Sequence, residues 1–422
     1  MRELNQMAIP LILTSGFGAL TSLINQGMIG QFIGIYAGAI GQVNLLLFVV
    51  SGVLGATAIS FNINGSKSYE KKEEDQFNRL FNANLWLSIF FGVAIAIFLF
   101  MTNQRFLSLV YGFEGQRLKV ASQYLSLMSM VPLLQLILFT YSSLFKIIRC
   151  TKKILIGSVI SIILNLILNY LLLFGSFGLP QLGVQGVAIA TIISMVVNIF
   201  LYVFFARHKV NYKWFIEIRS EIKVILKESI ALMAQEILEG SLFVIGIGII
   251  LERIGGLQST GYYLVIHLLT LIFIPMNMYA TALLTFLSAK MDGNLVRNTK
   301  KLVLTLTFSM CFLAIIFRIE IIGLLNNDAE VISYTSQIMA LVMLAYAFNP
   351  IQTLYKSVLF ALQESRYVLK QTFIVNGLIF IMMNLLVFIF EWQEYGLFLG
   401  LFLNYLLLTV LFKKKYQNYI RN

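Results

Sequence analysis

The sequence predicts an all-α integral membrane protein of about twelve transmembrane helices in two pseudo-symmetric six-helix lobes. Three observations support this prediction. Of the 422 residues, 59% are hydrophobic and 12% are charged, whereas soluble domains have roughly 45–50% and 25%. Apolar runs of about 20 residues, enough to cross roughly 30 Å of hydrocarbon, recur along the whole chain. Short motifs also repeat between the two halves.

The apolar runs give twelve predicted spans with soft boundaries, and no long hydrophilic domain interrupts them. The first run is expected to stay in the chain as a helix, because a second run follows at once and no small-residue cleavage site separates them. Prolines predict kinks at Pro10, Pro132, Pro275 and Pro350. The predicted spans are 7–29, 35–61, 80–101, 121–145, 154–175, 184–206, 228–251, 259–288, 302–323, 335–361, 371–391 and 395–412.

Weak internal repeats divide the spans into two sets of six. The Ala-Thr-Ala motif at 56–58 returns at 280–282, and the segment 143–149 aligns with 357–363, in both cases about half the chain further on. Six crossings per half leave both halves facing the same way, which makes them parallel repeats. We therefore expect an N-lobe at 1–206, a cytoplasmic linker at 207–227 and a C-lobe at 228–422.

The basic residues predict the orientation, because Lys and Arg near helix ends stay on the cytoplasmic side. With both termini and the even-numbered loops on one side, that side holds 26 of the 31 Lys and Arg residues. We expect a multi-pass protein of the cell membrane with both termini in the cytoplasm. The positive charge lies in short loops that anionic lipid headgroups neutralise, so membrane lipid, and not nucleic acid, is the expected partner.

Several kinds of chemistry find no support in the sequence. It contains no P-loop, serine elbow or paired histidines on a helix, so no enzymatic activity is expected. Cys150 and Cys311 are the only cysteines, which excludes a disulfide framework or a cysteine-rich metal site. His208 is interpreted as a loop residue and His267 as a core or cavity histidine. We expect no cofactor, and energy for any transport must come from an ion gradient or a partner.

Two acids lie deep inside the predicted span 228–251. Glu239 is about eleven residues from either end, or roughly 16 Å from each edge of the hydrocarbon. A charge at that depth costs at least ~2.5–3 kcal/mol, so such acids usually face a cavity and usually act. Glu236 is close enough to share a proton or a cation with Glu239.

The structural alternatives for Glu239 are an ion pair with Lys356 or a protonated carboxyl bonded to a carbonyl group. Lys356 and Lys146 are themselves expected to extend to the headgroups, because both lie near the cytoplasmic ends of their spans. Further cavity candidates are Gln235, His267 and Gln352.

The chain resembles the multidrug and toxic compound extrusion (MATE) family, within a superfamily that also contains polysaccharide flippases. The opening AIPLILTSGFGALTSLINQGMIG is similar to the family's first helix. The stretch from RCTKK through ILNLILNYLLLFGSFGLPQLGVQGVAIAT resembles its fifth helix, Gly-Pro-Gly loop and sixth helix. In the second half, ILEGSLF and NPIQTLYKSVLFALQES resemble the seventh and tenth helices.

The resemblance implies an N-lobe polar site. Many bacterial members use an Asp, an Asn–Asp pair four residues apart and a Thr as a cation or proton site, and these positions are Asn25, Asn165, Asn169 and Thr191 here. An amide cannot titrate, so a proton relay through these residues is not expected. They are either a weak site for a cation or polar substrate, or hydrogen bonds that join helices.

The resemblance also implies a C-lobe coupling site. Members that bind a cation there use a Glu in the seventh helix, which is Glu239 here, and an Asp in the tenth, where this chain has Asn349. We therefore expect Na⁺ or H⁺ to bind at Glu239, with help from Glu236 and Asn349.

The expected function is that of a secondary active transporter, working as a monomer. It would export amphiphilic or cationic small molecules, such as drugs, toxins or metabolites, by alternating access. One alternative is a flippase for a lipid-linked saccharide or another lipid precursor, which would need a cavity lined with basic residues. A second is a transport-incompetent membrane protein with a binding or immunity role, which the missing N-lobe acids suggest.

Overall fold

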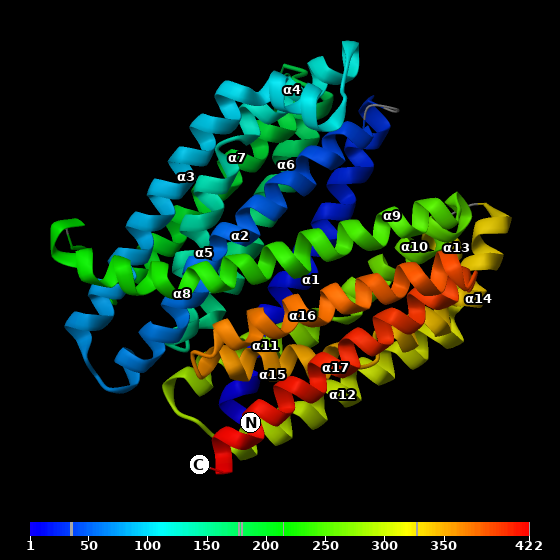
Figure 1. The fold of residues 1–422 in the computed structure, drawn as a ribbon. Coiled ribbons are helices and arrows are strands. Elements are labelled where there is room, and N and C mark those ends of the chain that lie inside the picture. The colour runs from blue at the N-terminus through cyan, green and yellow to red at the C-terminus, as the bar shows by residue number, and fades with distance from the viewer. Residues whose placement is uncertain (34–36, 176–177, 179, 214, 326–327, 422) are drawn as a thin grey trace. The chain divides into compact units, whose positions relative to one another are not determined.

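The chain folds into α-helices joined by short connections in the computed structural model (Figure 1). The structure describes residues 1–33, 37–175, 178, 180–213, 215–325 and 328–421. No strand occurs among these residues. The predicted all-α class is thereby confirmed for the described residues.

The helices form two compact units. The first unit is Ile9–Met233, and the second combines Met1–Ala8 with Ala234–Asn422. Helix α1 and helix α8 each contribute residues to both units.

In the first unit, α6 packs along α7, and α5 packs against both α2 and α3. The spans are helical because the hydrocarbon of a bilayer offers no partners for backbone groups, which must therefore be bonded within their own helix. The elements are α1 (Arg2–Ile33), α2 (Ala37–Glu70), α3 (Glu74–Tyr111), α4 (Gly115–Met128), α5 (Val131–Ile147), α6 (Thr151–Phe174), α7 (Val184–Ala206), the 3₁₀ helix η3 (Phe215–Ile218) and α8 (Arg219–Ile237).

In the second unit, α10 packs on α14, and α17 packs on α15 and α16. Both chain ends meet the start of α12: the Met1 sulfur contacts the Thr299 hydroxyl, and Tyr416 lies near Gly293. The elements are the π-helix η4 (Leu238–Phe243), α9 (Val244–Ile254), α10 (Gly256–Ile272), α11 (Ile274–Ala289), α12 (Gly293–Ile316), α13 (Arg318–Leu325), α14 (Ala329–Ala345), α15 (Asn349–Ala361), α16 (Ser365–Asn384), the π-helix η5 (Leu385–Ile389) and α17 (Gln393–Arg421).

Each of the twelve predicted spans falls on one helix or on consecutive helices interrupted by a short break. Among the described residues, nine helices are long and apolar enough to cross a membrane, or ten if the bent pair α10–α11 counts as one span. The predicted spans 7–29 and 228–251 are helical but are not among these ten. The second of them contains Glu236 and Glu239 and changes to a π-helix at its centre.

Prolines mark three of the breaks. Pro132, Pro275 and Pro350 stand in the first turns of α5, α11 and α15, each directly after an interruption. Proline is tolerated there because its missing N–H would have no partner within the helix. Helices α10 and α11 meet at 46°. By contrast, Pro10 lies inside the continuous helix α1, where no break was found.

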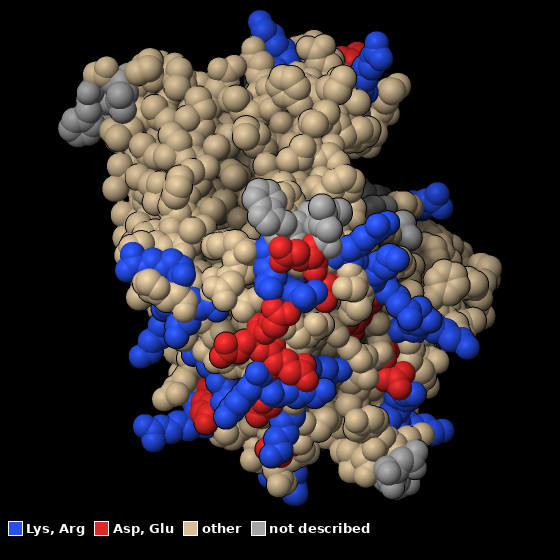
Figure 2. Space-filling view, turned by 90° about the vertical axis from the view of Figure 1, so that its left-hand side faces the viewer, with Lys and Arg blue, Asp and Glu red and all other residues tan. Residues whose placement is uncertain are grey.

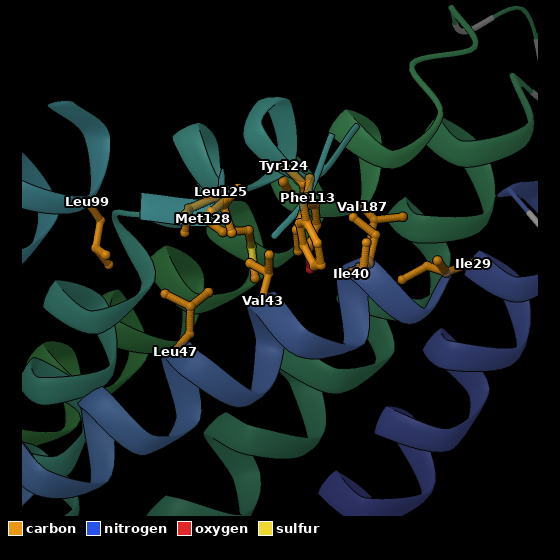
Figure 3. Close-up of a cluster of buried hydrophobic side chains, with 14 of the residues drawn as sticks. Ile29, Ile40, Val43, Leu47, Leu99, Phe113, Tyr124, Leu125, Met128 and Val187 are labelled. Atoms are coloured by element: carbon orange, nitrogen blue, oxygen red, sulfur yellow. The ribbon is translucent and has the colours of Figure 1, made fainter. Parts of the chain in front are cut away.

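A cluster of buried apolar side chains fixes the helices around one end of the first unit (Figure 3). Ile29 of α1, Leu173 of α6 and Val187 of α7 belong to it, and Figure 3 shows Val43 and Tyr124 pointing into the same interior. The Tyr124 hydroxyl also donates to Asn44 Oδ1 at 2.9 Å. This cluster holds α1, α6 and α7 together one helical turn away from the asparagines singled out in the sequence.

The predicted linker is fastened to α3. Asn82 Nδ2 donates to the Asn211 carbonyl at 2.7 Å, and the Lys213 amide donates to Asn82 Oδ1 at 3.1 Å. The Lys213 ammonium also pairs with Asp75 at 2.6 Å. Figure 2 shows one side of the molecule. Lys, Arg, Asp and Glu gather over one part of that side, while most of the remaining visible surface is uncharged, as is expected of a membrane protein.

The contact of α3 with α5 generates a first prediction. A Cβ atom on Gly92 would lie 2.6 Å from Leu133 Cα, a backbone atom that cannot turn away. We expect Gly92→Ala to lower the free energy of unfolding by about 1–3 kcal/mol through overpacking. The measurement is thermal or denaturant unfolding of the purified protein in detergent. Gly52→Ala in α2 is the matched control, because a Cβ there meets nothing within 4 Å. Equal effects of the two substitutions would contradict the proposed close contact.

Candidate functional site

Four polar residues predicted from the sequence meet in the first unit. Asn25 comes from α1, Asn165 and Asn169 from α6, and Thr191 from α7. Asn25 Nδ2 donates to Asn165 Oδ1 at 2.9 Å, and Asn169 Nδ2 donates to Asn25 Oδ1 at 2.8 Å. Asn165 Nδ2 reaches Thr191 Oγ1 at 3.4 Å. We call these four residues the asparagine cluster.

The asparagine cluster is buried in part and carries no charge, since Asn25 and Thr191 are of intermediate exposure. Asn169 is fully buried and Asn165 is 8% exposed. Asn165 Nδ2 also reaches Ser194 Oγ at 3.3 Å, so α6 is tied to α7 at two points. Asn169 Oδ1 is buried and accepts no hydrogen bond from the described residues. The cluster can therefore accept a hydrogen bond, but it cannot exchange a proton.

A second polar site forms where η4 faces α15. Glu239 lies in the π-helical turn, and Gln352 and Lys356 lie one turn apart on α15, which places them on one face. Lys356 Nζ donates to Glu239 Oε2 at 2.5 Å, and Gln352 Nε2 donates to Glu239 Oε1 at 3.4 Å. Both oxygens of the Glu239 carboxylate thus have a partner on α15. We call Glu236, Glu239, Gln352 and Lys356 the acid–lysine site.

The expectation that Lys356 extends to the headgroups was wrong. Its ammonium turns to Glu239, and the exposed fractions of the two side chains are 19% for Lys356 and 25% for Glu239. An ammonium in a poorly solvated place gains more from a carboxylate at hydrogen-bond distance than from a distant headgroup. The ion pair was the structural alternative weighed for Glu239.

Glu236 supplies a second negative group to the site. It ends α8 one turn before Glu239, is partly buried, and lies within electrostatic reach of both Glu239 and Lys356. The ion pairs found among the described residues do not include one with Glu236. The site therefore contains two carboxyl groups and one ammonium.

The remaining C-lobe candidates lie apart from Glu239. Gln235 is buried and donates to Thr372 Oγ1 of α16 at 3.0 Å. Asn349 is hydrogen-bonded to Tyr405 of α17, and no described contact joins it to Glu239. His267 is exposed on α10, whereas Tyr262, Val265 and Leu269 of the same helix are buried.

Sequence reasoning missed the tyrosines behind the acid–lysine site. Tyr405 bonds to Asn349 and Tyr346 and senses the charge of Glu239, and the Tyr346 and Tyr262 hydroxyls are 2.7 Å apart. These residues come from α17, α14 and α10. The sequence spacing of tyrosines in an apolar helix does not distinguish a tyrosine that hydrogen-bonds to other side chains from one that only packs. The hydrogen bonds between these tyrosines are therefore visible only in the folded structure.

A third partly buried carboxylate was also missed. Glu228 Oε2 accepts from Asn64 Nδ2 at 2.7 Å and from Ser60 Oγ at 3.3 Å, which ties α8 to α2 within the first unit. The sequence placed Glu228 at the edge of a span, where an acid is usually solvated. In the structure, its partners on α2 replace water.

The second unit also has an apolar pocket of about 400 Å³. It opens between α12 and α14 and reaches the start of α15. Its lining includes Phe273, Phe308, Met343, Tyr346 and Pro350. The pocket therefore touches the tyrosine network but not Glu239.

The fold and its buried polar sites define a polytopic all-α membrane protein, and comparison with known proteins makes the class specific. A protein-family model described as MatE matches residues 10–171. A probable multidrug resistance protein NorM of Thermotoga maritima is 26% identical over 215 residues, which cover 49% of this chain and 45% of that protein. A NorM protein of Photorhabdus laumondii, also described as a probable multidrug resistance protein, is 21% identical over 448 residues, covering 99% and 97%.

Solved structures have the same fold. A mutant of the Vibrio cholerae MATE transporter VcmN aligns with a TM-score of 0.88 at 20% identity, covering 100% of this chain and 97% of that one. The predicted resemblance to the MATE family is thus confirmed by the family model over residues 10–171 and by the NorM relatives, and the VcmN structure shows the same fold. The match spans less than half the length of the Thermotoga protein.

The asparagine cluster generates a second prediction. Asn165→Ala removes the acceptor of Asn25 and Asn169 and the donor to Thr191 and Ser194, so several buried groups lose a partner. We expect a loss of about 1–3 kcal/mol in unfolding free energy, measured by denaturant or thermal unfolding in detergent. Asn294→Ala is the control, since that side chain is exposed in the first turn of α12. A loss no larger than that of Asn294→Ala would show that the cluster is not structural.

The Glu239–Lys356 pair generates a third prediction. Glu239→Gln and Lys356→Met should each destabilise the protein by roughly 1–3 kcal/mol. This is less than the 3–5 kcal/mol seen on breaking a fully buried pair, because both side chains are partly exposed. The double variant should recover much of the loss, since neither charge is then left alone. Unfolding free energies of the parent, the two single variants and the double variant give the coupling directly.

The control for this cycle is the pair Glu364–Lys415, whose side chains are 35% and 34% exposed. Its coupling should be at most about 1 kcal/mol. Additive losses at Glu239 and Lys356 would mean that the pair does not form.

Proposed function

We propose that the chain is a secondary active transporter that exports amphiphilic or cationic small molecules across the cell membrane by alternating access. Support comes from the MatE model that matches residues 10–171, from relatives described as multidrug resistance proteins, and from the division into two helical units. In this proposal, residues 1–206 and 228–422 are the two lobes, 207–227 is the linker, and both termini face the cytoplasm. The protein moves solutes and makes or breaks no covalent bond.

The observation that carries the proposal is the Glu239 carboxylate inside a π-helical turn. Such turns interrupt regular helix bonding and often occur at functional sites. The carboxylate is deep in its span yet 25% exposed, so an ion or a cationic substrate can reach it. Glu236 and Lys356 are close enough for its charge to depend on theirs. We infer that Na⁺ or H⁺ couples to transport here.

The asparagine cluster has a different role in this proposal. Its amides have no negative charge with which to hold a cation tightly, and they cannot carry a proton. Hydrogen bonds between α1, α6 and α7 instead keep the first unit as one body during the cycle. Rigid-body movement of one lobe against the other is the usual form of alternating access in transporters with repeats.

Ion coupling requires that the ion binds one facing state more tightly than the other. We infer that the acid–lysine site is closed in one facing state and open in the other. The ion then binds the open state more tightly, because the Glu239 carboxylate is available to it only when Lys356 and Gln352 of α15 release it. The flippase alternative needs free basic residues around its substrate. Lys356 does not meet that need, because it is paired.

The fourth prediction tests this function. Purified protein in liposomes should export a fluorescent organic cation under an imposed Na⁺ or H⁺ gradient, and Glu239→Gln should reduce the gradient-driven rate by at least about fivefold, the lower end of typical coupling. Glu364→Gln is the control, because that partly exposed acid also pairs with a lysine but lies outside the site. If Glu239→Gln exports the cation as fast as the parent under both gradients, coupling through this carboxylate is ruled out.

A further inference from the structure

The acid–lysine site already contains a cation. Lys356 Nζ is 2.5 Å from Glu239 Oε2, and Gln352 Nε2 covers the other oxygen at 3.4 Å. Both donors come from α15, and both point at the carboxylate that was predicted to bind the coupling ion. The position that an incoming metal cation would need is therefore taken by an ammonium group of the protein itself.

Na⁺ binding would require this ammonium to leave. A hard cation needs several oxygen ligands around it, and here the groups nearest to the Glu239 oxygens are the nitrogen donors of Lys356 and Gln352. A second positive charge beside Lys356 would also be repelled, and repulsion is stronger where solvent screening is weak. A proton does not need several oxygen ligands, because it binds to a single carboxylate oxygen.

The charged and titratable groups around the Glu239–Lys356 pair come from three helices. Glu236 approaches from α8, Lys356 from α15 and Tyr405 from α17, while α16 presents the neutral Thr372 to Gln235. With two carboxyl groups and one ammonium, Lys356 can neutralise the charge of only one carboxylate at a time. Glu236 is near enough to attract the ammonium when Glu239 loses its charge.

We propose that Lys356 is the resident cation of the acid–lysine site and stands where a coupling Na⁺ would otherwise bind. Only a proton, or the ammonium-type group of a cationic substrate, then exchanges with it at Glu239. In the proton branch, a water-borne proton adds to a Glu239 oxygen, the ion pair breaks, and Lys356 keeps its own proton and turns toward Glu236. This inference rests on the proposed function, because it names the ligand that the coupling site takes.

The test is a binding measurement that needs no transport. Thermal unfolding of the full chain in detergent is followed while Na⁺ replaces N-methyl-glucamine at constant ionic strength, since a ligand of the folded state raises the unfolding temperature. We expect no Na⁺-specific stabilisation of the parent. Lys356→Met, which keeps the length of the side chain but removes its charge, should bind Na⁺ at least about tenfold more tightly. The double variant Lys356→Met/Glu239→Gln should lose this response.

Lys146→Met is the matched control, because it removes another lysine from an apolar helix, α5, in the first unit. It should behave like the parent. Lys356→Gln serves if Lys356→Met does not fold. Two results would overturn the proposal: a Na⁺ response of the parent that Glu239→Gln abolishes, or no Na⁺ response in either Lys356 variant. The first requires only the parent and one variant.

Transport separates this inference from the proposed function. In liposomes, the parent should export the organic cation under a proton gradient and ignore a Na⁺ gradient, whereas Lys356→Met should respond to Na⁺. A parent that exports nothing under any gradient would remove the proposed function, while the Na⁺ titration would still decide whether Lys356 occupies the cation position.

Discussion

The structure depends on one constraint: a hydrocarbon interior offers no hydrogen bonds, so every polar group there must find its partner within the chain. Helices satisfy the backbone, and Pro132, Pro275 and Pro350 are placed where a backbone donor would have been unpaired anyway. The same constraint selects the contacts of the polar side chains. The asparagines of the cluster bond to one another, and the partly buried carboxylate of Glu239 bonds to a lysine.

The two units meet this constraint in different ways. In the asparagine cluster the first unit has amides where relatives have acids, so the protonation of this cluster is fixed and its hydrogen bonds hold at any pH that keeps the protein folded. The second unit keeps charge but neutralises it locally between Glu239 and Lys356. Neutral contacts favour rigidity, whereas an ion pair with partial exposure can open and close. The division of labour in the proposed cycle follows from this difference in chemistry.

Much of the fold could be predicted from the sequence, because the length and polarity of a span are dictated by the bilayer. The asparagine cluster could be predicted as well, since Asn165 and Asn169 lie one helical turn apart and the resemblance supplied Asn25 and Thr191. The Glu239–Lys356 pair was one of several alternatives left open, and the surroundings of Asn349 and His267 could not be predicted. Their outcome depends on how α15, α17 and α10 are rotated about their axes, and an apolar helix in an apolar solvent has no strong periodic pattern that fixes this rotation.

The π-helical turn η4 positions Glu239 for its ion pair with Lys356. A π turn holds one more residue than an α turn, so it shifts the side chains that follow and frees a backbone carbonyl group from regular bonding. Glu239 lies within such a turn, while Gln352 and Lys356 lie on the regular helix α15. The irregular element can adjust, and the regular element cannot. A local change in η4, together with a turn of the Lys356 side chain, therefore opens the pair without moving the backbone of α15.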